Sequence, residues 1–472
     1  MKKSFVRKRR QPIGPLLRVA VVLLLPIGFV PVACAEKPSW PRFLGVEFSG
    51  DAINPQSPQQ LAKSPRIRWA LDVGDGYGLG VFSNDRYFHF DSINGDDGRR
   101  ERLRAIDRET GKAIWSVDAA LRYRDFYGYE SGPRSAPTLA DADDDGVPDR
   151  VVTMGVGGRL TCRSIADGKE LWHVDTSSKY GVVQNFFGVG GSPLVWNRQV
   201  IVMVGGSPPA DANLPPGALD RVSSNGSLLV AFDLSDGTER WRGGDDLASY
   251  SSPRIASIDG KWRVLILARD AFWMLDAESG KVIAKYPHRA SILESVNAMM
   301  PLVDQDQIFI SECYGPGSAL LDAKTDPLRV VWRDADQRRN RAMRSHWSAP
   351  VKIGDNLYGC SGRNPGDCDF RCVQFSTGQV LWTALPRRRC SVTRLGDCYL
   401  VWDERGEAII AKANPERFDE VNRFKIEQLV ASEDAKVETP VRLRPPCWAA
   451  PIVLGNELYV RGDRSVVRLD FR

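Results

Sequence analysis

A short motif that recurs along the chain constrains the fold more than any other feature. It consists of alternating apolar residues that end in Asp, a Thr/Ser/Asp-Gly-Lys turn, and a Trp a few residues later. The clearest copy runs from Leu103 through Asp107 and Gly111 to Trp115. Weaker or degenerate copies end at Trp172, Trp241, Ala284, Trp332 and Trp382. One unit therefore repeats about every 45 to 70 residues, which indicates a repeat architecture rather than unrelated domains.

Each part of this motif has a physical role. The apolar alternation predicts a half-buried strand with a period of two residues. The Asp and Thr side chains can bond the backbone of the turn and the Gly accepts a positive φ, which predicts a tight hairpin. The Trp begins the next strand and has a ring large enough to wedge between neighbouring sheets.

A second regular feature precedes each turn, namely a Ser/Ala-Pro or similar step followed by a short apolar strand. Its copies end at Pro137, Pro193, Pro253, Pro301, Pro350 and Pro451. Each unit therefore contains four short antiparallel strands, which is the content of a propeller blade. Forty-two Gly and thirty Pro, with almost no long helical periodicity, agree with an all-β chain.

Counting the units predicts a single eight-bladed β-propeller of four-stranded antiparallel blades, with seven blades as the alternative. The last unit, from Trp448 to Phe471, lacks an outer strand, whereas residues 66–72 carry Trp69 without any strands before them. We expect this N-terminal strand to complete the last blade and close the ring, which leaves no exposed sheet edge. The propeller then spans residues 66–472, after an extended segment at 36–65.

The first 35 residues are predicted to be a secretory signal peptide. A basic stretch between Lys2 and Arg10 precedes the apolar run from Val19 to Leu25, and a small-residue cleavage site ends at Ala35. Pro26 interrupts the apolar run, which disfavours an uncleaved membrane anchor. Lipid attachment at Cys34 is the other alternative, so any membrane contact would be through that anchor. Export places the protein in the periplasm or cell envelope of a bacterium.

The signal peptide also accounts for the basic balance of the sequence. The whole chain carries 64 Lys and Arg against 59 Asp and Glu, and seven of the basic residues precede residue 36. The mature chain therefore has 57 basic and 59 acidic residues, a net charge of −2. This balance argues against a nucleic-acid partner.

Eight cysteines remain after cleavage, and in an oxidising compartment clustered cysteines are first interpreted as disulfides. Cys390 and Cys398 flank one predicted hairpin, and Cys360, Cys368 and Cys372 flank another. The sequence leaves the connectivity open. Zinc is an alternative for the second group, although its spacing matches no familiar ligand pattern.

The repeated Asp-x-x-Thr-Gly-Lys-x-x-Trp resembles the tryptophan-docking repeat of the PQQ-like, or quinoprotein alcohol dehydrogenase-like, β-propeller family over roughly residues 60–472. The family includes dehydrogenases that use pyrroloquinoline quinone (PQQ), and the propeller lipoprotein of the outer-membrane β-barrel assembly machinery. The dehydrogenases carry adjacent cysteines, inserted helices and a calcium ligand set of Glu, Asn and Asp, none of which is recognisable here. The resemblance therefore implies the fold, and PQQ is not expected.

An acidic loop lies outside the repeat consensus, between the strands predicted at 138–140 and 150–153. Oxygen ligands alternate in it and Gly146 permits a sharp bend, which is typical of calcium loops. By similarity to the calcium loops of integrin-type propellers, the side chains of Asp141, Asp143, Asp145 and Asp149 and the carbonyl of Val147 are the expected ligands of a structural Ca²⁺. The alternative is a solvated acidic hairpin.

The loops that enter the innermost strands of a propeller crowd one mouth of its central channel, and here they are rich in aromatic, Arg and Asn residues. Such side chains suit the recognition of sugar rings, peptides or a flat cofactor, although single aromatics can also pack between blades. The predicted binding residues are Tyr127, Arg134, Phe187, Asn297, Arg344, His346, Trp347 and Trp448.

Because the repeat specifies a fold and not a reaction, no catalytic residue is assigned. We expect a monomeric, non-catalytic binding or scaffolding propeller with a protein or glycan partner in the cell envelope, involved in envelope or outer-membrane assembly. A PQQ-dependent oxidoreductase and a carbohydrate-binding propeller are the alternatives.

Overall fold

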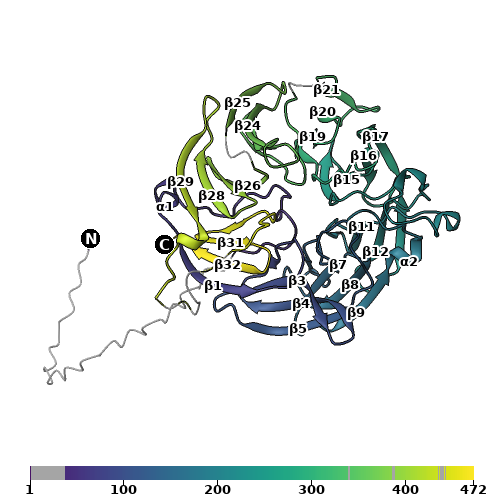
Figure 1. The fold of residues 1–472 in the computed structure, drawn as a ribbon, viewed down its shortest axis with the longest axis horizontal. Coiled ribbons are helices and arrows are strands. Elements are labelled where there is room, and N and C mark those ends of the chain that lie inside the picture. The colour runs from purple at the N-terminus through teal and green to yellow at the C-terminus, as the bar shows by residue number, and fades with distance from the viewer. Residues whose placement is uncertain are drawn as a thin grey trace. The chain divides into compact units, whose positions relative to one another are not determined.

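A computed structural model describes residues 38–471, apart from 338–340, 385–387, 434, 436–440 and 442. Lys37–Arg472 forms one compact unit. Its strands assemble into eight four-stranded antiparallel sheets arranged as a ring (Figure 1). The predicted eight-bladed propeller is therefore confirmed. The predicted signal peptide and the Cys34 anchor lie outside the described residues.

Each blade is built from consecutive strands, of which the first is innermost. Blade 1 contains β2 (Val81–Phe82), β3 (Arg86–Gly95), β4 (Gly98–Asp107) and β5 (Ala113–Ala120), and blade 2 contains β6 (Thr138–Ala140), β7 (Arg150–Met154), β8 (Arg159–Ser164) and β9 (Glu170–Asp175). Blade 3 contains β10 (Leu194–Trp196), β11 (Gln199–Met203), β12 (Leu229–Asp233) and β13 (Glu239–Gly243), and blade 4 contains β14 (Arg254–Ile258), β15 (Lys261–Leu267), β16 (Ala271–Asp276) and β17 (Val282–Pro287).

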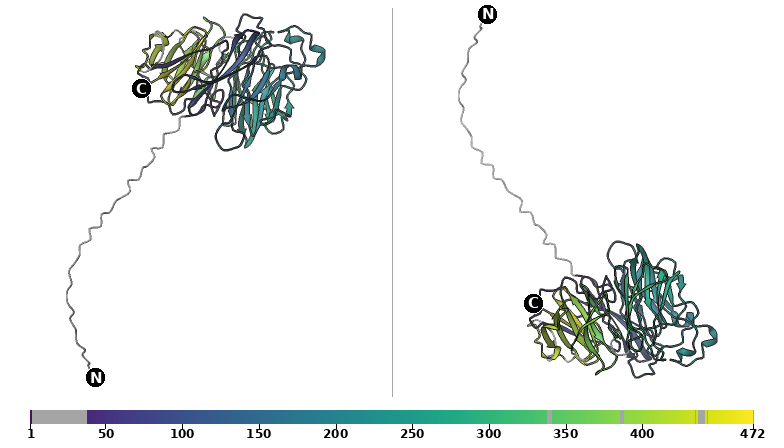
Figure 2. Two further views of the ribbon diagram at one scale, coloured as in Figure 1. Left: turned by 90° about the horizontal axis from the view of Figure 1, so that it is seen from below. Right: turned by 90° about the horizontal axis from the view of Figure 1, so that it is seen from above.

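The second half of the ring follows the same order. Blade 5 contains β18 (Leu302–Asp304), β19 (Gln307–Glu312), β20 (Gly317–Asp322) and β21 (Arg329–Arg333), and blade 6 contains β22 (Val351–Ile353), β23 (Asn356–Ser361), β24 (Asp369–Gln374) and β25 (Val380–Ala384). Blade 7 contains β26 (Cys390–Leu395), β27 (Cys398–Asp403), β28 (Glu407–Lys412) and β29 (Asp419–Lys425). Blade 8 contains β30 (Ile452–Leu454), β31 (Glu457–Arg461) and β32 (Ser465–Asp470), together with β1 (Arg66–Asp72). Figure 2 shows the ring from two sides.

The N-terminal strand closes the ring as predicted. β1 pairs antiparallel with β32, from Arg66 opposite Asp470 to Asp72 opposite Ser465, with a bulge between Ile67 and Trp69. The last blade thus takes three strands from the C-terminal end and one from the N-terminal end. Because both ends of the chain share one sheet, the last blade is complete and every blade has a neighbour on each side.

In most blades the repeated Trp docks the blade onto the next one. Trp172 of blade 2 donates from Nε1 to the carbonyl of Leu234 in blade 3 over 2.9 Å. Its ring covers Gly237, whose φ is +75°, and a Cβ at Gly237 would lie only 2.7 Å from that ring. The same donation to the next blade is made by Trp69, Trp115, Trp332 and Trp382. The motif therefore couples a tight turn to the interface between blades, which explains why its Gly and Trp recur together.

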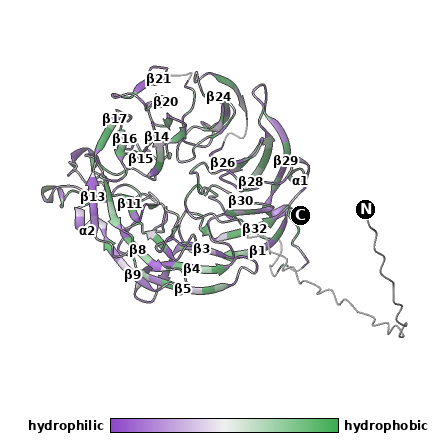
Figure 3. Cartoon of the chain, turned by 180° about the vertical axis from the view of Figure 1, so that it is seen from behind, coloured by the Kyte–Doolittle hydropathy of each residue, from purple (hydrophilic) through white to green (hydrophobic). Residues whose placement is uncertain are grey.

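The Asp of the motif stabilises the turn by local hydrogen bonds. Asp107 Oδ1 accepts from the backbone N–H and from the hydroxyl of Thr110, both over 2.7 Å. Apolar side chains of the middle strands pack between adjacent blades, as in the cluster that contains Met154, Leu160 and Phe232. Figure 3 shows hydrophobic residues along these strands and hydrophilic residues on outer strands such as β13.

Residues 40–54, here called the crossing segment, span one end of the central channel. Trp40 forms a bridge with Phe82 of blade 1, and the Pro41 carbonyl accepts from Leu139 of blade 2. Phe48 packs in the core of blades 3 and 4, after which Ala52 and Ile53 bond to blades 7 and 8. The segment therefore contacts opposite sides of the ring.

Helices are short in the part of the chain that the structure describes. They are α1 (Pro58–Leu61), α2 (Thr176–Tyr180) and the 3₁₀ turns η1 (Pro209–Asp211), η2 (Leu219–Arg221) and η3 (Ile426–Gln428). None of them has the length and apolar character needed to cross a membrane.

The eight cysteines of the described residues are all buried, and none is joined to another. Cys390 and Cys398 lie at opposite ends of the β26–β27 hairpin, since Cys390 is opposite Asp403 and Cys398 is opposite Leu395. Cys372 lies opposite Tyr358.

Candidate functional site

The loops that lead into the innermost strands surround a cavity of about 300 Å³ at the mouth of the central channel. We call this cavity the cup. Every blade contributes residues to the wall of the cup. One residue from each blade, in order from blade 1 to blade 8, is Tyr77, Arg134, Phe187, Tyr250, Met300, Trp347, Arg389 and Trp448.

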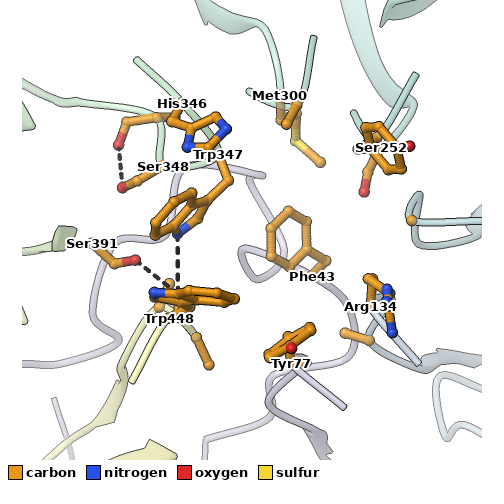
Figure 4. Close-up of a pocket in the computed structure, with 18 of the residues that line it drawn as sticks. Phe43, Tyr77, Arg134, Ser252, Met300, His346, Trp347, Ser348, Ser391 and Trp448 are labelled. Carbon is orange, nitrogen blue, oxygen red and sulfur yellow. Dashed lines mark hydrogen bonds between the residues drawn. The ribbon is translucent and has the colours of Figure 1, made fainter. Parts of the chain in front are cut away.

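The crossing segment contributes the opposite end of the cup. Trp40, Phe43, Leu44 and Ser49 all line it. Figure 4 shows the Phe43 ring in the middle of the cavity, between Tyr77, Trp448 and Met300. Since the segment is hydrogen-bonded to blades on both sides of the ring, it forms a floor, and the cup opens toward the mouth.

Aromatic rings form one side of the cup. Trp347 and Trp448 lie with their ring centroids 5.5 Å apart, and Trp347 Nε1 donates to the carbonyl of Trp448 over 3.2 Å. Tyr77 contacts the other face of this group, 4.9 Å from Trp448. The Arg389 guanidinium lies over both indoles and is fixed by Glu404, whose Oε2 accepts from Arg389 Nε over 2.7 Å. These contacts hold the aromatic wall in one arrangement.

Arg134 lies across the cavity from the Trp347 side chain (Figure 4). Its guanidinium is held between Tyr77 and Tyr123, at 5.3 and 5.8 Å from their ring centroids, and it donates to the Gly132 carbonyl. Nε and Nη2 of Arg134 are buried and make no hydrogen bond, although Nη2 lies 3.9 Å from Asp125 Oδ1 in an ion pair. Nε and Nη2 form the edge of a guanidinium that binds a carboxylate with two parallel hydrogen bonds.

The charges of the cup are all of one sign. Arg134, Arg363 and Arg389 line it, and no described Asp or Glu does. Arg363 lies 4.3 Å over the ring of Tyr314. Burial, reinforced by the nearby Arg389 and Arg363, lowers the pKa of His346 to about 3, so this imidazole is neutral. The cup therefore combines an apolar, aromatic interior with hydrogen-bond donors for an anion.

The structure brings together five of the eight predicted binding residues, namely Arg134, Phe187, His346, Trp347 and Trp448. Tyr127 lies at the rim, where its ring meets the edge of Phe186 at a centroid distance of 5.3 Å. The rim continues outward through Phe126, Tyr127 and Tyr129, which remain 53%, 44% and 41% exposed.

Two of the predicted binding residues lie away from the cup and make other contacts. Asn297 is fully buried and donates from Nδ2 to the carbonyls of Ala268, Arg269 and His288, so it fixes loop backbone. Arg344 lies outside the cup and pairs with Asp367, at 3.0 Å between Nη2 and Oδ1. A buried amide and a paired guanidinium of this kind do not face the cavity.

Sequence reasoning missed the floor and part of the wall. The segment that contains Phe43 was expected to be extended. Two aromatic residues outside any predicted strand, Trp40 and Phe43, could have indicated that this segment packs against the propeller. Tyr77 precedes the first strand of blade 1 as Trp347 precedes the first strand of blade 6. Aligning the blades on these strands would have identified it.

The acidic loop forms a separate cluster. Carboxylate oxygens of Asp141, Asp143 and Asp145 lie within 4.8 Å of one another. Although desolvation raises the pKa of Asp141, hydrogen bonds from the N–H groups of Gly146, Asp144 and Asp143 hold it below its ordinary value. The hydrogen bond to Asp141 and the neighbouring acids raise the pKa of Asp143. Hard oxygen donors crowded in this way fit a calcium ion.

Asp149 is not part of this cluster. Asp149 Oδ1 accepts from the N–H of Ala142 over 2.9 Å, and its other oxygen pairs with Arg150. The Val147 N–H donates to Asp145 Oδ1 over 2.7 Å, next to the cluster. The loop therefore brings together three of the four predicted side-chain ligands.

Eight four-stranded blades around a channel, most of them docked to the next by a Trp, define a PQQ-like β-propeller. A family model described as outer membrane protein assembly factor BamB matches residues 99–384, more than half of the chain. The chain belongs to this family.

The fold is shared with solved structures at low sequence identity. BamB from Moraxella catarrhalis is 15% identical, with 86% of this chain and 100% of that one covered and a TM-score of 0.54. Quinohemoprotein alcohol dehydrogenase from Comamonas testosteroni is 12% identical, with 92% and 80% covered and a TM-score of 0.57. A europium-containing methanol dehydrogenase is 12% identical, with 88% of each chain covered and a TM-score of 0.56. A comparison with curated proteins found no match. At these identities the likeness concerns the fold alone.

Proposed function

We propose that this chain is an exported, non-catalytic binding propeller of the bacterial cell envelope, which holds a protein partner through the cup. The family description, an outer-membrane assembly factor, supports a role in envelope assembly. The observation that carries the proposal is the cup itself, an aromatic cavity lined by the guanidinium groups of Arg134, Arg363 and Arg389. Concave, mostly apolar pockets with a few convergent polar groups are the usual sites of ligand binding.

The chemistry of the cup defines what it accepts. A group with an apolar or aromatic body fits against Phe43, Tyr77 and Trp448. An attached carboxylate would be attracted by the Arg134 guanidinium, for which it would compete with Asp125. Burying a cation there would be costly, because no described acidic side chain lines the cavity.

The residues of the cup do not fit PQQ with its calcium ion. The resemblance to quinoprotein dehydrogenases implies a calcium ligand set of Glu, Asn and Asp beside the cofactor, whereas no Asp or Glu among the described residues lines this cup. The side-chain amide that lines it, Asn364, belongs to the β23–β24 loop. A carboxylate base is also missing from the described lining, which favours binding over oxidation of a substrate.

A protein partner fits the mouth better than a glycan does. Proteins bind sugar hydroxyls through hydrogen-bond donors and acceptors together, and carboxylates are the strongest side-chain acceptors. The described lining of the cup contains no carboxylate side chain. The exposed rings of Phe126, Tyr127 and Tyr129 extend the apolar surface beyond the cavity. Exposed aromatic residues next to a pocket are typical of protein interfaces.

The mature domain immobilised on a resin and exposed to envelope extracts would test the proposal. We expect it to retain a discrete protein that the Trp448→Ala variant loses and that the Trp262→Ala variant, altered at an exposed indole of blade 4, retains. Equal retention by all three proteins would contradict the role of the cup. Binding to a glycan array that Trp448→Ala abolishes would favour the carbohydrate alternative, and dye reduction with PQQ and calcium would favour the enzyme.

We also propose that the acidic loop binds a structural Ca²⁺ through Asp141, Asp143 and Asp145. Support comes from the convergence of their oxygens within 4.8 Å and from the crowding that raises the pKa of Asp143. A cation relieves such repulsion between carboxylates. The loop joins β6 to β7 on blade 2, so the ion would stabilise that hairpin.

A further inference from the structure

Three buried thiols meet where blades 6 and 7 adjoin. Cys360 lies on β23, Cys368 directly precedes β24, and Cys390 begins β26. Their residues are 7%, 1% and 3% exposed and belong to one apolar cluster. The Cys360 side chain interacts with both Cys368 and Cys390, so it is the shared neighbour in this group.

The backbone brings Cys360 and Cys368 together at the neck of a loop. Cys360 is opposite Phe370 in the β23–β24 pairing, so Cys368 is its diagonal neighbour on the same face. Gly362 has a φ of +131°, and a Cβ there would lie 2.7 Å from the Cys368 Cα. The two strands therefore approach closely at this point, and only Gly fits.

The loop closed by this neck reaches the cup. Arg363 and Asn364 line the cavity, and Arg363 stacks on Tyr314. Asp367, at the other side of the loop, pairs with Arg344. Anything that fixes the neck therefore restricts side chains that take part in the candidate site.

We propose that the thiols of Cys360 and Cys368 are joined by a disulfide when the chain folds in the presence of a disulfide oxidant. Cys368 is favoured over Cys390 because it is eight residues from Cys360 rather than thirty, so less loop-closure entropy is lost when the pair meets. Cys390 would remain a thiol.

The reaction is a thiol–disulfide exchange that balances without any further reactant. One protein thiol loses its proton, attacks the oxidant and releases one small-molecule thiolate. The second protein thiol then loses its proton, displaces the remaining half of the oxidant and releases the second thiolate, which takes up a proton. Two protein thiols and one disulfide thus become one protein disulfide and two thiols.

Burial determines when this exchange takes place. Although a hydrogen bond with Cys368 lowers the pKa of Cys360, the Cys390 thiol and burial raise it well above its ordinary value. A hydrogen bond with Cys360 and burial raise the pKa of Cys368. Thiolate is the reacting form, so folded, reduced protein should exchange slowly, and the bond should form while the chain folds. The inference is independent of the ligand proposed for the cup and shares with it only the oxidising compartment.

Trypsin offers a direct test on the mature chain refolded with reduced and oxidised glutathione, then alkylated. Cleavage after Lys352, Arg363, Arg371, Arg389 and Arg394 separates the three cysteines into peptides 353–363, 364–371 and 390–394. We expect a linked ion of 353–363 with 364–371 that disappears on reduction, and an alkylated 390–394. A link between 353–363 and 390–394, or alkylation of all three peptides, would overturn the proposal.

Variants separate this bond from other cysteine chemistry. Cys360→Ser should abolish the linked ion, whereas Cys372→Ser, the matched change in the same blade, and Cys390→Ser should preserve it. The wild-type peptide map decides the question even if a variant fails to fold. Trypsin should also cut native reduced protein at Arg363 several-fold faster than native oxidised protein. Equal rates would contradict the effect on the loop, while leaving ligand binding by the cup unaffected.

Discussion

Arg108 Nε donates to Glu457 Oε2 over 2.9 Å, although the two residues are 349 positions apart in the chain. Glu457 Oε1 also accepts from Arg468 Nη2 over 2.8 Å. All three side chains are almost fully buried, at the junction between blade 8 and blade 1. The carboxylate therefore joins the last blade to the first, next to the Trp69 side chain that docks on the Arg108 carbonyl.

Removing the Glu457 charge should weaken this junction. Arg108 would lose its counter-charge and Arg468 would keep only Glu109, and breaking a buried ion pair on one side costs about 3 to 5 kcal/mol. We expect Glu457→Gln to lower the free energy of unfolding by roughly 3 kcal/mol in a denaturant titration. Glu420→Gln, which removes the exposed partner of Arg423, should change it by less than about 1 kcal/mol. Equal effects would show that the junction is not held by this network.

Arg134 should determine selectivity for anions in the cup. N-acetyltryptophan carries an aromatic body and a carboxylate, and its amide derivative carries the same body without the charge. Hydrogen bonds to charged groups contribute about 1.5 to 3 kcal/mol, or roughly a tenfold to hundredfold change in affinity. We expect Arg134→Gln to weaken calorimetric binding of the acid by this factor and to leave binding of the amide almost unchanged.

A rim variant provides the control for this measurement. Arg124 is exposed and lies over Phe126, 5.7 Å from its ring centroid, and it does not line the cup. Arg124→Gln should therefore bind the acid like the wild type. If the two variants lost affinity equally, general electrostatics would explain the effect and the specific role of Arg134 would be refuted.

Calcium should raise the melting temperature of the mature domain. The ion would bind the native loop and not the unfolded chain, so the stabilisation should grow with its concentration. We expect the increase to disappear with chelator and in Asp143→Ala or Asp145→Ala, and to persist in Asp96→Ala, an exposed acid in the β3–β4 turn. A melting temperature that changes with neither calcium nor chelator would refute the calcium site.

Glu101 should make stability depend on pH. Burial raises its pKa to about 7 from an ordinary 4.5, although the Val156 N–H donates to its Oε1 over 2.7 Å. The native state therefore holds a proton that the unfolded chain releases between these values, so this contribution to stability is complete below about pH 4.5 and is lost as the pH rises to about 7.

The variant Glu101→Gln isolates this effect, because it removes the titrating group. Relative to the variant, the wild type should lose roughly 3 kcal/mol of unfolding free energy between about pH 4.5 and 7. Denaturant titrations at several pH values would measure it. Glu294→Gln, at an exposed position in the loop before β18, should show a difference that does not change with pH. A constant difference for Glu101→Gln as well would contradict the raised pKa.

The ring and its closure could be predicted because each depends on a local pattern repeated many times. Asp107, Gly111 and Trp115 specify strand, turn and docking group within one motif, and the missing outer strand of the last blade left residues 66–72 as its complement. The structure places these residues as the pattern requires.

The contents of the cup were only partly predictable, because a polar side chain in a loop can face a cavity or its own backbone. Arg134 faces the cup, whereas Asn297 bonds to three carbonyls behind it. Phe43 reaches the channel only because contacts with blades 1, 2, 7 and 8 guide the crossing segment over it. Such long-range pairing leaves no periodic signal along the chain.

The crossing segment also has a consequence for biogenesis. Residues 40–72 emerge from the ribosome early, yet Ala52, Ile53 and β1 bond to blades 7 and 8, which are synthesised last. During translation, Ala52, Ile53 and β1 therefore remain without these partners until residues 390–470 have been synthesised. The ring and the cup are therefore completed late, and a nascent chain that lacks blades 7 and 8 has neither a closed ring nor a complete cup.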